Sequence, residues 1–411
     1  MNDNYSSWIC CQLGAREHYA IPRALHQQKQ LAHLITDAWV SPQSALSVLP
    51  IPTLTKLRER FHPDLAQAPV HAFTSSLIHF ELAQRIYKKT GWKLIIARNQ
   101  WFQQQIVRSL DIISRQLKYQ PTLFAYSYAA LELFRYAKTK GWRTILGQID
   151  PGSMDENIVL REHIKYPNYQ SKWQSAPPQY WTSWKEECSL ADRIVVNSLW
   201  SKQALQQVGI PEHKIDIIPL AYQPPEQAYN FVRTYPQSFT IERPLRVLFL
   251  GKVALRKGIA ALLESATLLK GQPIEFWLVG SQDIAKTQQN QELKQVQWIG
   301  TVPRSATAKY YQLADVFLFP TLSDGFGLTQ LEAQAWKLPV IASRFCGEVV
   351  KHQINGLLLP EVSLQAIVDA LLFCLNNPQQ LQAFSQQSTN IDSFSLSQLQ
   401  YHLQTLAYAV I

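Results

Sequence analysis

Residues 320–343 read Pro320-Thr-Leu-Ser-Asp-Gly-Phe-Gly-Leu-Thr-Gln-Leu-Glu-Ala-Gln-Ala-Trp-Lys-Leu-Pro-Val-Ile-Ala-Ser343 and follow an apolar run from Val316 to Phe319. The apolar run predicts a buried strand, and Gly325 and Gly327 permit a close backbone approach before a helix that starts near Leu328. Unpaired N–H groups at a helix N-terminus attract anions. The segment therefore predicts a site for a phosphorylated sugar outside the strand end.

Two carboxylates flank this turn. Asp324 precedes it, where it would accept sugar hydroxyls, and Glu332 lies in the helix, where it would accept from a ribose. The turn itself, Gly325-Phe326-Gly327-Leu328-Thr329, would contact the donor through its backbone. The alternative is an ordinary strand, turn and helix, with Asp324 as a turn residue and Glu332 as a solvated helix position. The segment alone does not separate the two interpretations.

Length and composition indicate a folded protein of two domains. The chain has 411 residues, 46% of them hydrophobic, which is more than one ordinary core accommodates. A net charge of +9 suits acidic partners such as nucleotide sugars or anionic lipids without choosing among them. Nucleic acid is not expected as a partner, because no helix-turn-helix, zinc or RNP-like motif is present.

Neither a signal peptide nor a membrane span is evident from the sequence. The first residues carry no basic and apolar leader, and no run reaches the roughly 20 apolar residues of a transmembrane helix. We therefore expect a cytoplasmic protein. The five cysteines have neither metal-ligand spacing nor a paired framework, so we expect buried free thiols and no metal site: Cys10, Cys11, Cys188, Cys346 and Cys374.

Short apolar runs alternate with segments of helical period along the chain, which predicts an α/β protein with parallel sheets. In the first half, we expect strands near Trp8–Gln12, Ala32–Val40, Val70–Thr74, Lys93–Ala97, Leu123–Tyr126, Thr144–Gln148 and Arg193–Asn197. In the second half, we expect them near Leu245–Leu250, Glu275–Val279, Val296–Ile299, Val316–Phe319 and Val340–Ala342.

A connector rich in proline and polar residues, from Gln223 to Pro244, separates the two halves. The predicted organisation is therefore an N-terminal Rossmann-like domain over residues 1–235 and a C-terminal one over residues 236–390. Residues 391–411 form a last helical segment.

A second candidate phosphate site follows the strand Leu245–Leu250. Gly251-Lys-Val-Ala-Leu-Arg-Lys-Gly258 places Lys252 and Lys257 after the strand end, where they would neutralise a diphosphate. A solvated basic loop is the alternative, and it is the commoner location of lysines. A further strand ends at Gly280-Ser281, which is a weak signal by itself.

These C-terminal motifs resemble those of retaining GT-B glycosyltransferases, in particular glycosyltransferase family 4, also called glycosyl transferase group 1. The similarity extends from about Trp8 to Asn376 and is most specific in the second half. It implies two Rossmann-like domains facing a central cleft, with Lys252 and Lys257 on the donor diphosphate and Glu332 on the ribose. Asp324 stands where the family usually has Glu, so the carboxylate is retained on a shorter side chain.

The resemblance also implies donor contacts at Gly280 and Ser281 and a C-terminal helix that packs back on the first domain. In the first domain, it implies that the loop Gly14-Ala15-Arg16 faces the cleft. Gly147-Gln-Ile-Asp-Pro-Gly152 occupies the place where many relatives have a His near the transferred sugar. Gln148 or Asp150 would take over that hydrogen bond, although an Asp-Pro-Gly turn is an equal alternative.

The resemblance implies a hexosyltransferase that moves a sugar from a nucleotide-diphosphate sugar to a glycan, lipid-linked or small-molecule acceptor, without a cofactor or metal. A non-catalytic scaffold, or a phosphorylase or epimerase of the same fold, remains open. Basic and aromatic residues alternate in Tyr87–Lys93 and Arg98–Phe102. They favour either peripheral contact with an anionic membrane, at its inner face, or a solvated basic surface.

Overall fold

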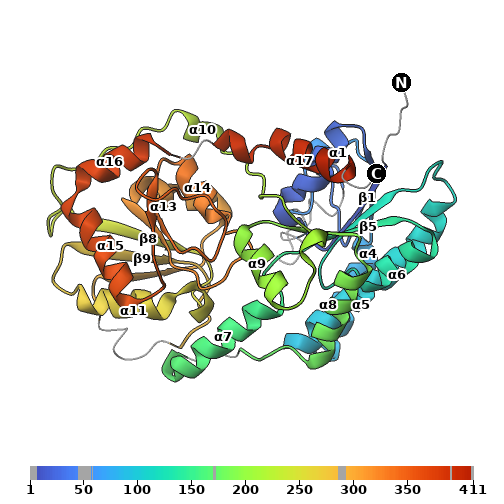
Figure 1. Ribbon diagram of the computed structural model, residues 1–411, viewed down its shortest axis with the longest axis horizontal. Helices are drawn as coiled ribbons and strands as arrows, with labels where there is room; N and C mark the ends of the chain where they lie inside the picture. Colours follow the sequence, from blue (N-terminus) through green and yellow to red (C-terminus); the bar gives the residue numbers. More distant parts are fainter. Residues whose placement is uncertain are drawn as a thin grey trace.

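The computed structural model describes residues 7–44, 57, 59–169, 173–285, 293–388 and 391–408, and it forms two lobes side by side (Figure 1). The first lobe is built on a parallel sheet with the order β3-β2-β1-β4-β5-β6-β7. Its strands are β1 (Trp8–Gln12), β2 (Leu31–Thr36), β3 (Val70–Ala72), β4 (Thr122–Tyr126), β5 (Arg143–Gly147), β6 (Arg193–Val196) and β7 (Ile215–Ile217).

Helices cover both faces of this sheet. They are α1 (Ala20–Gln27), α4 (Thr74–Ile86), α5 (Gly91–Ser114), α6 (Leu131–Thr139), α7 (Ser153–Lys165), α8 (Pro178–Leu190) and α9 (Leu199–Gln207). Neighbouring residues of β1 point to opposite faces, so that Ile9 joins the core under α5 and α6 while Trp8 joins the core under α1. A strand that is buried on both faces is apolar along most of its length, as β1 is from Trp8 to Cys11.

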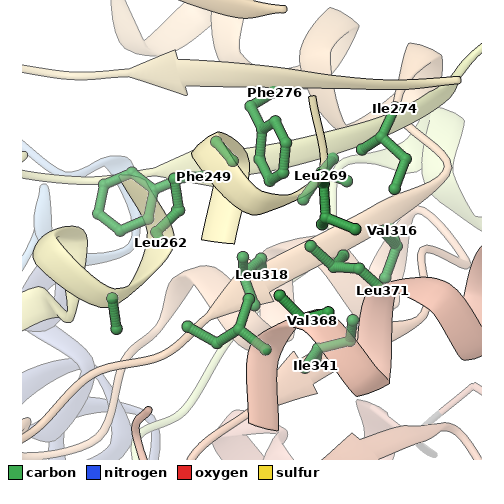
Figure 2. Close-up of a cluster of buried hydrophobic side chains, with 14 of the residues drawn as sticks. Phe249, Leu262, Leu269, Ile274, Phe276, Val316, Leu318, Ile341, Val368 and Leu371 are labelled. Atoms are coloured by element: carbon green, nitrogen blue, oxygen red, sulfur yellow. The ribbon is translucent and has the colours of Figure 1, made fainter. Parts of the chain in front are cut away.

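The second lobe repeats the arrangement with the order β10-β9-β8-β11-β12-β13, again all parallel. Its elements are β8 (Leu245–Leu250), α11 (Ile259–Leu268), β9 (Ile274–Val279), β10 (Val296–Gly300), α13 (Thr307–Leu313), β11 (Val316–Phe319), α14 (Thr329–Ala335), β12 (Val340–Ala342), β13 (Gly356–Leu358), α15 (Leu364–Asn376) and α16 (Pro378–Gln386). Figure 2 shows part of its core, in which Phe276, Leu318 and Leu371 meet from two strands and α15. Burial of each such side chain contributes about 1.5–3 kcal/mol.

The last helix, α17 (Leu396–Tyr408), lies on the first lobe beside α1 (Figure 1). Leu399, Leu403 and Leu406 recur at helical spacing and are buried in the same core as α1. The connector between the lobes contains α10 (Glu226–Tyr229) and Arg233, whose guanidinium donates to carbonyl oxygens around α13 and α14. The chain up to residue 235 therefore packs partly on the second lobe.

Every strand expected from the sequence has a counterpart in the structure except one, although β2 ends at Thr36, before the expected Val40, and neither β7 nor β13 was expected. Lys93–Ala97 was expected as a strand, and this is wrong, because the segment lies inside α5. Its short apolar run, Leu94-Ile95-Ile96, has the length of a strand, but the helical period that begins at Gly91 continues on both sides of it. The expectation of buried free thiols is confirmed for all five cysteines. Among the described residues, no helix is both long and apolar enough to cross a membrane.

Strand order reverses at β1/β4 in the first sheet and at β8/β11 in the second. In open α/β sheets, ligands bind outside the carboxyl ends of the strands at such reversal points. The loops after β1 and β5, and those after β8 and β11, line one cavity between the lobes. The fold thus brings both candidate phosphate loops to the same place.

Candidate active site

A cavity of about 500 Å³ lies between the two lobes. The first lobe contributes Leu13, Arg16, Glu17, His18, Ile149 and Asn197, and the second contributes Gly251, Lys252, Lys257, Asp324, Phe326, Gly327, Leu328 and Thr329. Eight of these were predicted from the sequence: Arg16, Lys252, Lys257, Asp324, Phe326, Gly327, Leu328 and Thr329. The structure therefore brings the two phosphate motifs together with the first-domain loop.

Lys257 and Asp324 form an ion pair in this cavity, and both side chains are largely buried. Lys257 ends a short 3-10 turn after β8, and Gly258 follows with φ +73°, packed against the Pro320 carbonyl so closely that a Cβ would not fit. Burial raises the pKa of Asp324, but the charges of Lys257 and Arg256 outweigh burial and hold that pKa below its usual value. The Asp324 carboxylate is therefore charged at neutral pH, while burial lowers the pKa of Lys257 despite its ion pair with Asp324.

Lys252 lies at the mouth of the cavity and is much more exposed. Its side chain is 56% exposed, and its Nζ lies 2.7 Å from Asp283 Oδ2. An ion pair this open to solvent is weak, so Lys252 is available to a competing anion. The cavity lining thus carries the ammonium groups of Lys252 and Lys257 and the guanidinium of Arg16, beside the carboxyl groups of Asp324 and Glu17.

Glu332 lies in a neighbouring cavity of about 570 Å³, which Tyr222, Arg304 and Trp336 also line. Its Oε2 accepts a hydrogen bond of 2.7 Å from the Tyr311 hydroxyl, and its Oε1 lies 3.9 Å from Arg304 Nη2. Asp324 and Glu332 therefore line two different cavities. A ligand that extends across both cavities could place a sugar near Asp324 and a ribose near Glu332.

Gly280 and Ser281 do not line the cavity. Gly280 has φ +139° and packs on the Gly251 carbonyl with no room for a Cβ, while the Ser281 carbonyl accepts from the Val253 amide at 2.8 Å. Gly280 and Ser281 therefore contact the loop that carries Lys252 and help to fix its position. Gly325 also supports the site, because it packs against the Ile149 carbonyl of the first lobe without space for a side chain.

The loop after β1 closes the cavity from the first lobe. The Gly14 amide donates to Asp37 Oδ1 at 2.9 Å, and the Arg60 guanidinium covers the glycine. Gly14 itself lines an adjacent cavity in the first lobe, while Ala15 packs toward the core under α1. Of the three loop residues that were predicted, Arg16 is the one that faces the cleft between the lobes.

Glu17, His18 and Tyr19 have φ of 52°, 52° and 58°, a left-handed turn that non-glycine residues adopt at a cost of about 1–3 kcal/mol each. The turn brings the His18 ring to the second lobe, where its Nδ1 lies 3.2 Å from Arg304 Nη1. Burial and the Arg304 charge lower the pKa of His18 to about 4, so the ring is neutral at pH 7. No local pattern in the sequence identifies the partner of His18, which lies 286 positions away.

Gln148 and Asp150 form a buried polar network at the end of β5 instead of projecting into the cleft. Gln148 Nε2 donates to Tyr128 Oη and to Asp150 Oδ1, and its Oε1 accepts from Trp184 Nε1 at 2.9 Å. Tyr128 donates to Asp150 Oδ1 at 2.5 Å. Burial and the charge of Asp155 raise the pKa of Asp150 to about 6. It is Ile149, between the two predicted residues, that lines the cleft.

No group of three or more His, Cys, Asp or Glu side chains within the described ranges has the arrangement of a metal site.

Comparisons with known proteins agree with this geometry. Residues 244–377 match the family model described as Glycosyl transferases group 1. The chain is 27% identical over 194 residues to the amylovoran biosynthesis glycosyltransferase AmsK of Erwinia amylovora, an alignment that covers 44% of this chain and 46% of that protein. It is 24% identical over 198 residues to a Campylobacter jejuni enzyme named N,N'-diacetylbacillosaminyl-diphospho-undecaprenol alpha-1,3-N-acetylgalactosaminyltransferase. The chain spans about half the length of such curated relatives.

The whole fold is similar to solved structures. Anabaena HepE in complex with UDP superposes with a TM-score of 0.62 at 16% identity, covering 98% of this chain and 99% of that one. Sucrose-phosphate synthase from Thermosynechococcus elongatus gives a TM-score of 0.63, also at 16% identity, with 98% of both chains covered. The chain thus has the GT-B fold, and its second lobe carries a glycosyl transferases group 1 domain.

Proposed function

We propose that this protein is a retaining glycosyltransferase of family 4 that transfers a hexose from a nucleotide-diphosphate sugar to a glycan, lipid-linked or small-molecule acceptor. The observation that carries the proposal is the cleft in which Lys252, Lys257 and the start of α14 meet the first-lobe loop. The family model on residues 244–377 supports a transferase, and the UDP and UDP-glucose complexes of HepE make UDP-sugars the first donors to test.

The proposed catalysis is electrostatic. Lys252 and Lys257 stabilise the negative charge that develops on the departing diphosphate, so the reaction needs neither a metal nor a cofactor. Asp324 orients the donor sugar, and Glu332 in the adjacent cavity accepts from the ribose hydroxyls. The acceptor hydroxyl attacks from the face that the diphosphate leaves, and an oxygen of the leaving diphosphate takes its proton. The close packing of Gly325 on Ile149 excludes water from the reacting atoms.

A thermal-shift panel of UDP-, GDP- and ADP-sugars, each with magnesium and with EDTA, tests the proposal. We expect one nucleotide series to raise the melting temperature equally with and without metal, because bound ligand stabilises the folded state. Glu332→Ala and Lys257→Ala should abolish that rise. Absence of any shift in the wild type would favour a non-catalytic scaffold, and a shift that requires magnesium would refute the metal-free mechanism.

A further inference from the structure

Two cavities in the first lobe continue the cleft away from the donor site. The inner one has a volume of about 160 Å³ and shares Leu13, Arg16 and Ile149 with the cleft. The outer one has a volume of about 830 Å³ and shares Leu13, Ile95 and Asn99 with the inner one. The three cavities are therefore neighbours in series, and a single elongated molecule bound along them would end beside the reacting atoms.

The inner cavity has the size and walls of a subsite for one sugar ring. Its volume is well below the roughly 300–1,000 Å³ of ordinary small-molecule pockets, so it admits one small ring. Tyr128 and Tyr180, stacked with ring centroids 4.9 Å apart, form an aromatic wall, and Gln12 and Asn99 supply amides. Gln12 Oε1 is buried and has no hydrogen-bond partner among the residues that the structure describes, although the Nε2 of the same amide donates to the Gly14 carbonyl. A wall of aromatic rings and amides matches a ring with apolar faces and a rim of hydroxyls.

The outer cavity is lined by apolar side chains and three arginines. Arg60 lies 3.5 Å from Asp37, and Arg98 lies 2.5 Å from Glu81. Arg85 is the third, and within the described part of the chain it has no carboxylate partner. The lining therefore carries one uncompensated positive charge. An anionic group would complement it.

The apolar part of this lining continues out of the cavity onto the surface. Ile78, Leu82 and Ile86 follow one another at four-residue spacing on α4, and they form a stripe that ends at Ile86 with its side chain 77% exposed. Ile95 on α5 is also exposed and faces the same cavity. Of the thirteen residues of α4, only Leu77 is fully buried. An apolar stripe of this kind beside an unpaired arginine suits an amphiphile that carries both an anionic group and a hydrocarbon chain.

We propose that the acceptor is a lipid-linked saccharide whose sugar and hydrocarbon chain are joined through phosphate. The sugar ring occupies the inner cavity, the phosphate lies at Arg85, and the chain leaves along α4 and α5. This inference rests on the proposed transferase function. In the reaction, the bond between the donor anomeric carbon and the diphosphate oxygen breaks, the bond from that carbon to the acceptor oxygen forms, and the acceptor proton leaves on the diphosphate.

Calorimetric titration of the full chain with soluble probes tests the outer cavity. We expect geranyl phosphate to bind at least tenfold more tightly than geraniol or inorganic phosphate, because both halves of the probe are recognised. Arg85→Glu and Ile95→Glu should each weaken the binding of geranyl phosphate at least tenfold. Arg115→Glu and Ile112→Glu, at exposed positions near the far end of α5, are the matched controls and should leave it unchanged. Equal affinity for inorganic phosphate, or no effect of either cavity variant, would overturn the proposal.

A second comparison tests the inner cavity. Glucosyl geranyl phosphate, which adds one sugar to the probe, should bind the wild type at least tenfold more tightly than geranyl phosphate. Ala129→Met fills the inner cavity and should remove that difference while it preserves the binding of geranyl phosphate itself. If the variant still bound glucosyl geranyl phosphate more tightly than geranyl phosphate by the same factor as the wild type, the sugar subsite would be refuted. A parallel titration with UDP separates the two hypotheses. If the wild type does not bind UDP, the transferase proposal fails, whereas the acceptor-site proposal is still decided by the titrations with the geranyl probes.

Discussion

Lys257 and Asp324, 67 residues apart in the sequence, form an ion pair on the floor of the cleft between the lobes. The pair explains how two charged side chains are held in a largely buried place before a donor arrives. Under the proposed function, a donor diphosphate would supply Lys257 with a new anionic partner, and the donor sugar would supply hydroxyl donors to Asp324. Donor binding would then exchange one set of charge-assisted interactions for another, without an unpaired buried charge at either stage.

The effects of removing Lys257 and Asp324 on the free energy of unfolding should be strongly non-additive. Removal of one partner leaves the other buried and uncompensated, so Asp324→Asn and Lys257→Met should each lower the free energy of unfolding by about 3 kcal/mol. The double variant should lose clearly less than the sum of the two. Urea unfolding of the four proteins measures the coupling. Additive losses would mean that the two side chains act independently.

Lys252 should matter for binding and hardly at all for stability. Its ion pair with Asp283 is solvent-exposed, so Lys252→Ala should change the free energy of unfolding by less than about 1 kcal/mol. Loss of one phosphate contact should nevertheless weaken UDP-sugar binding about tenfold. Asp283→Ala is the control: it releases Lys252 and should not weaken binding. Equal loss of affinity in both variants would show that the pair acts by shaping the loop.

Close approach of the two lobes at Gly325 should be essential for transfer. A Cβ at this position would collide with the Ile149 carbonyl, so Gly325→Ala should hold the lobes apart and lower kcat at least tenfold. Ser201→Ala, which removes the hydrogen bonds that Ser201 Oγ donates to the Gly325 carbonyl and accepts from Ser198 Oγ, provides a comparison without added bulk. Kinetics and small-angle scattering measure the two effects. Unchanged kcat in Gly325→Ala would mean that the lobes do not need this contact.

Glu332 and the Tyr311 hydroxyl should act together on the nucleoside end of the donor. Glu332→Gln keeps the shape but loses the charge, and we expect about a tenfold loss of affinity for UDP. Tyr311→Phe removes the 2.7 Å hydrogen bond that orients the carboxylate and should have a smaller effect in the same direction. Fluorescence titration with UDP and with inorganic diphosphate separates the subsites, because inorganic diphosphate should bind all three proteins alike. A parallel loss for inorganic diphosphate would place Glu332 at the phosphates.

The sequence predicts the fold well where an apolar run is bounded by a turn residue: Pro320 follows Val316–Phe319, and Gly251 follows Leu245–Leu250. It fails at Lys93–Ala97, because the short apolar run Leu94-Ile95-Ile96 is compatible with either a strand or a turn of helix until the flanking period is considered. β13 was not expected, since its three residues carry no period of their own and depend on pairing with β12.

The candidate site also has residues that the sequence predicts and contacts that it does not. Lys257, Asp324 and the turn after Asp324 could be predicted, because strand ends, glycines and charged residues lie close together in the sequence. The contact of His18 with Arg304, and the cover that Arg60 places on Gly14, depend on how distant segments meet. Gln148 or Asp150 was expected near the transferred sugar from the family resemblance, yet burial and Trp184 direct the Gln148 amide inward. Position along a strand end does not reveal on which side of the sheet a polar group finds its partners.

Asp150 should make stability depend on pH in a defined direction. Burial raises its pKa from an ordinary 3.8 to about 6, so the protonated form is favoured in the folded state. Its contribution to stability is fully present below pH 3.8 and is lost as the pH rises through 6. Asp150→Asn retains the Oδ1 acceptor for Tyr128 and the Gly152 amide but cannot titrate. The unfolding free energy of the wild type, relative to this variant, should therefore fall by about 2 kcal/mol between pH 4 and pH 7. Urea unfolding across that range measures the difference, and two parallel curves would mean that Asp150 has an ordinary pKa in the folded protein.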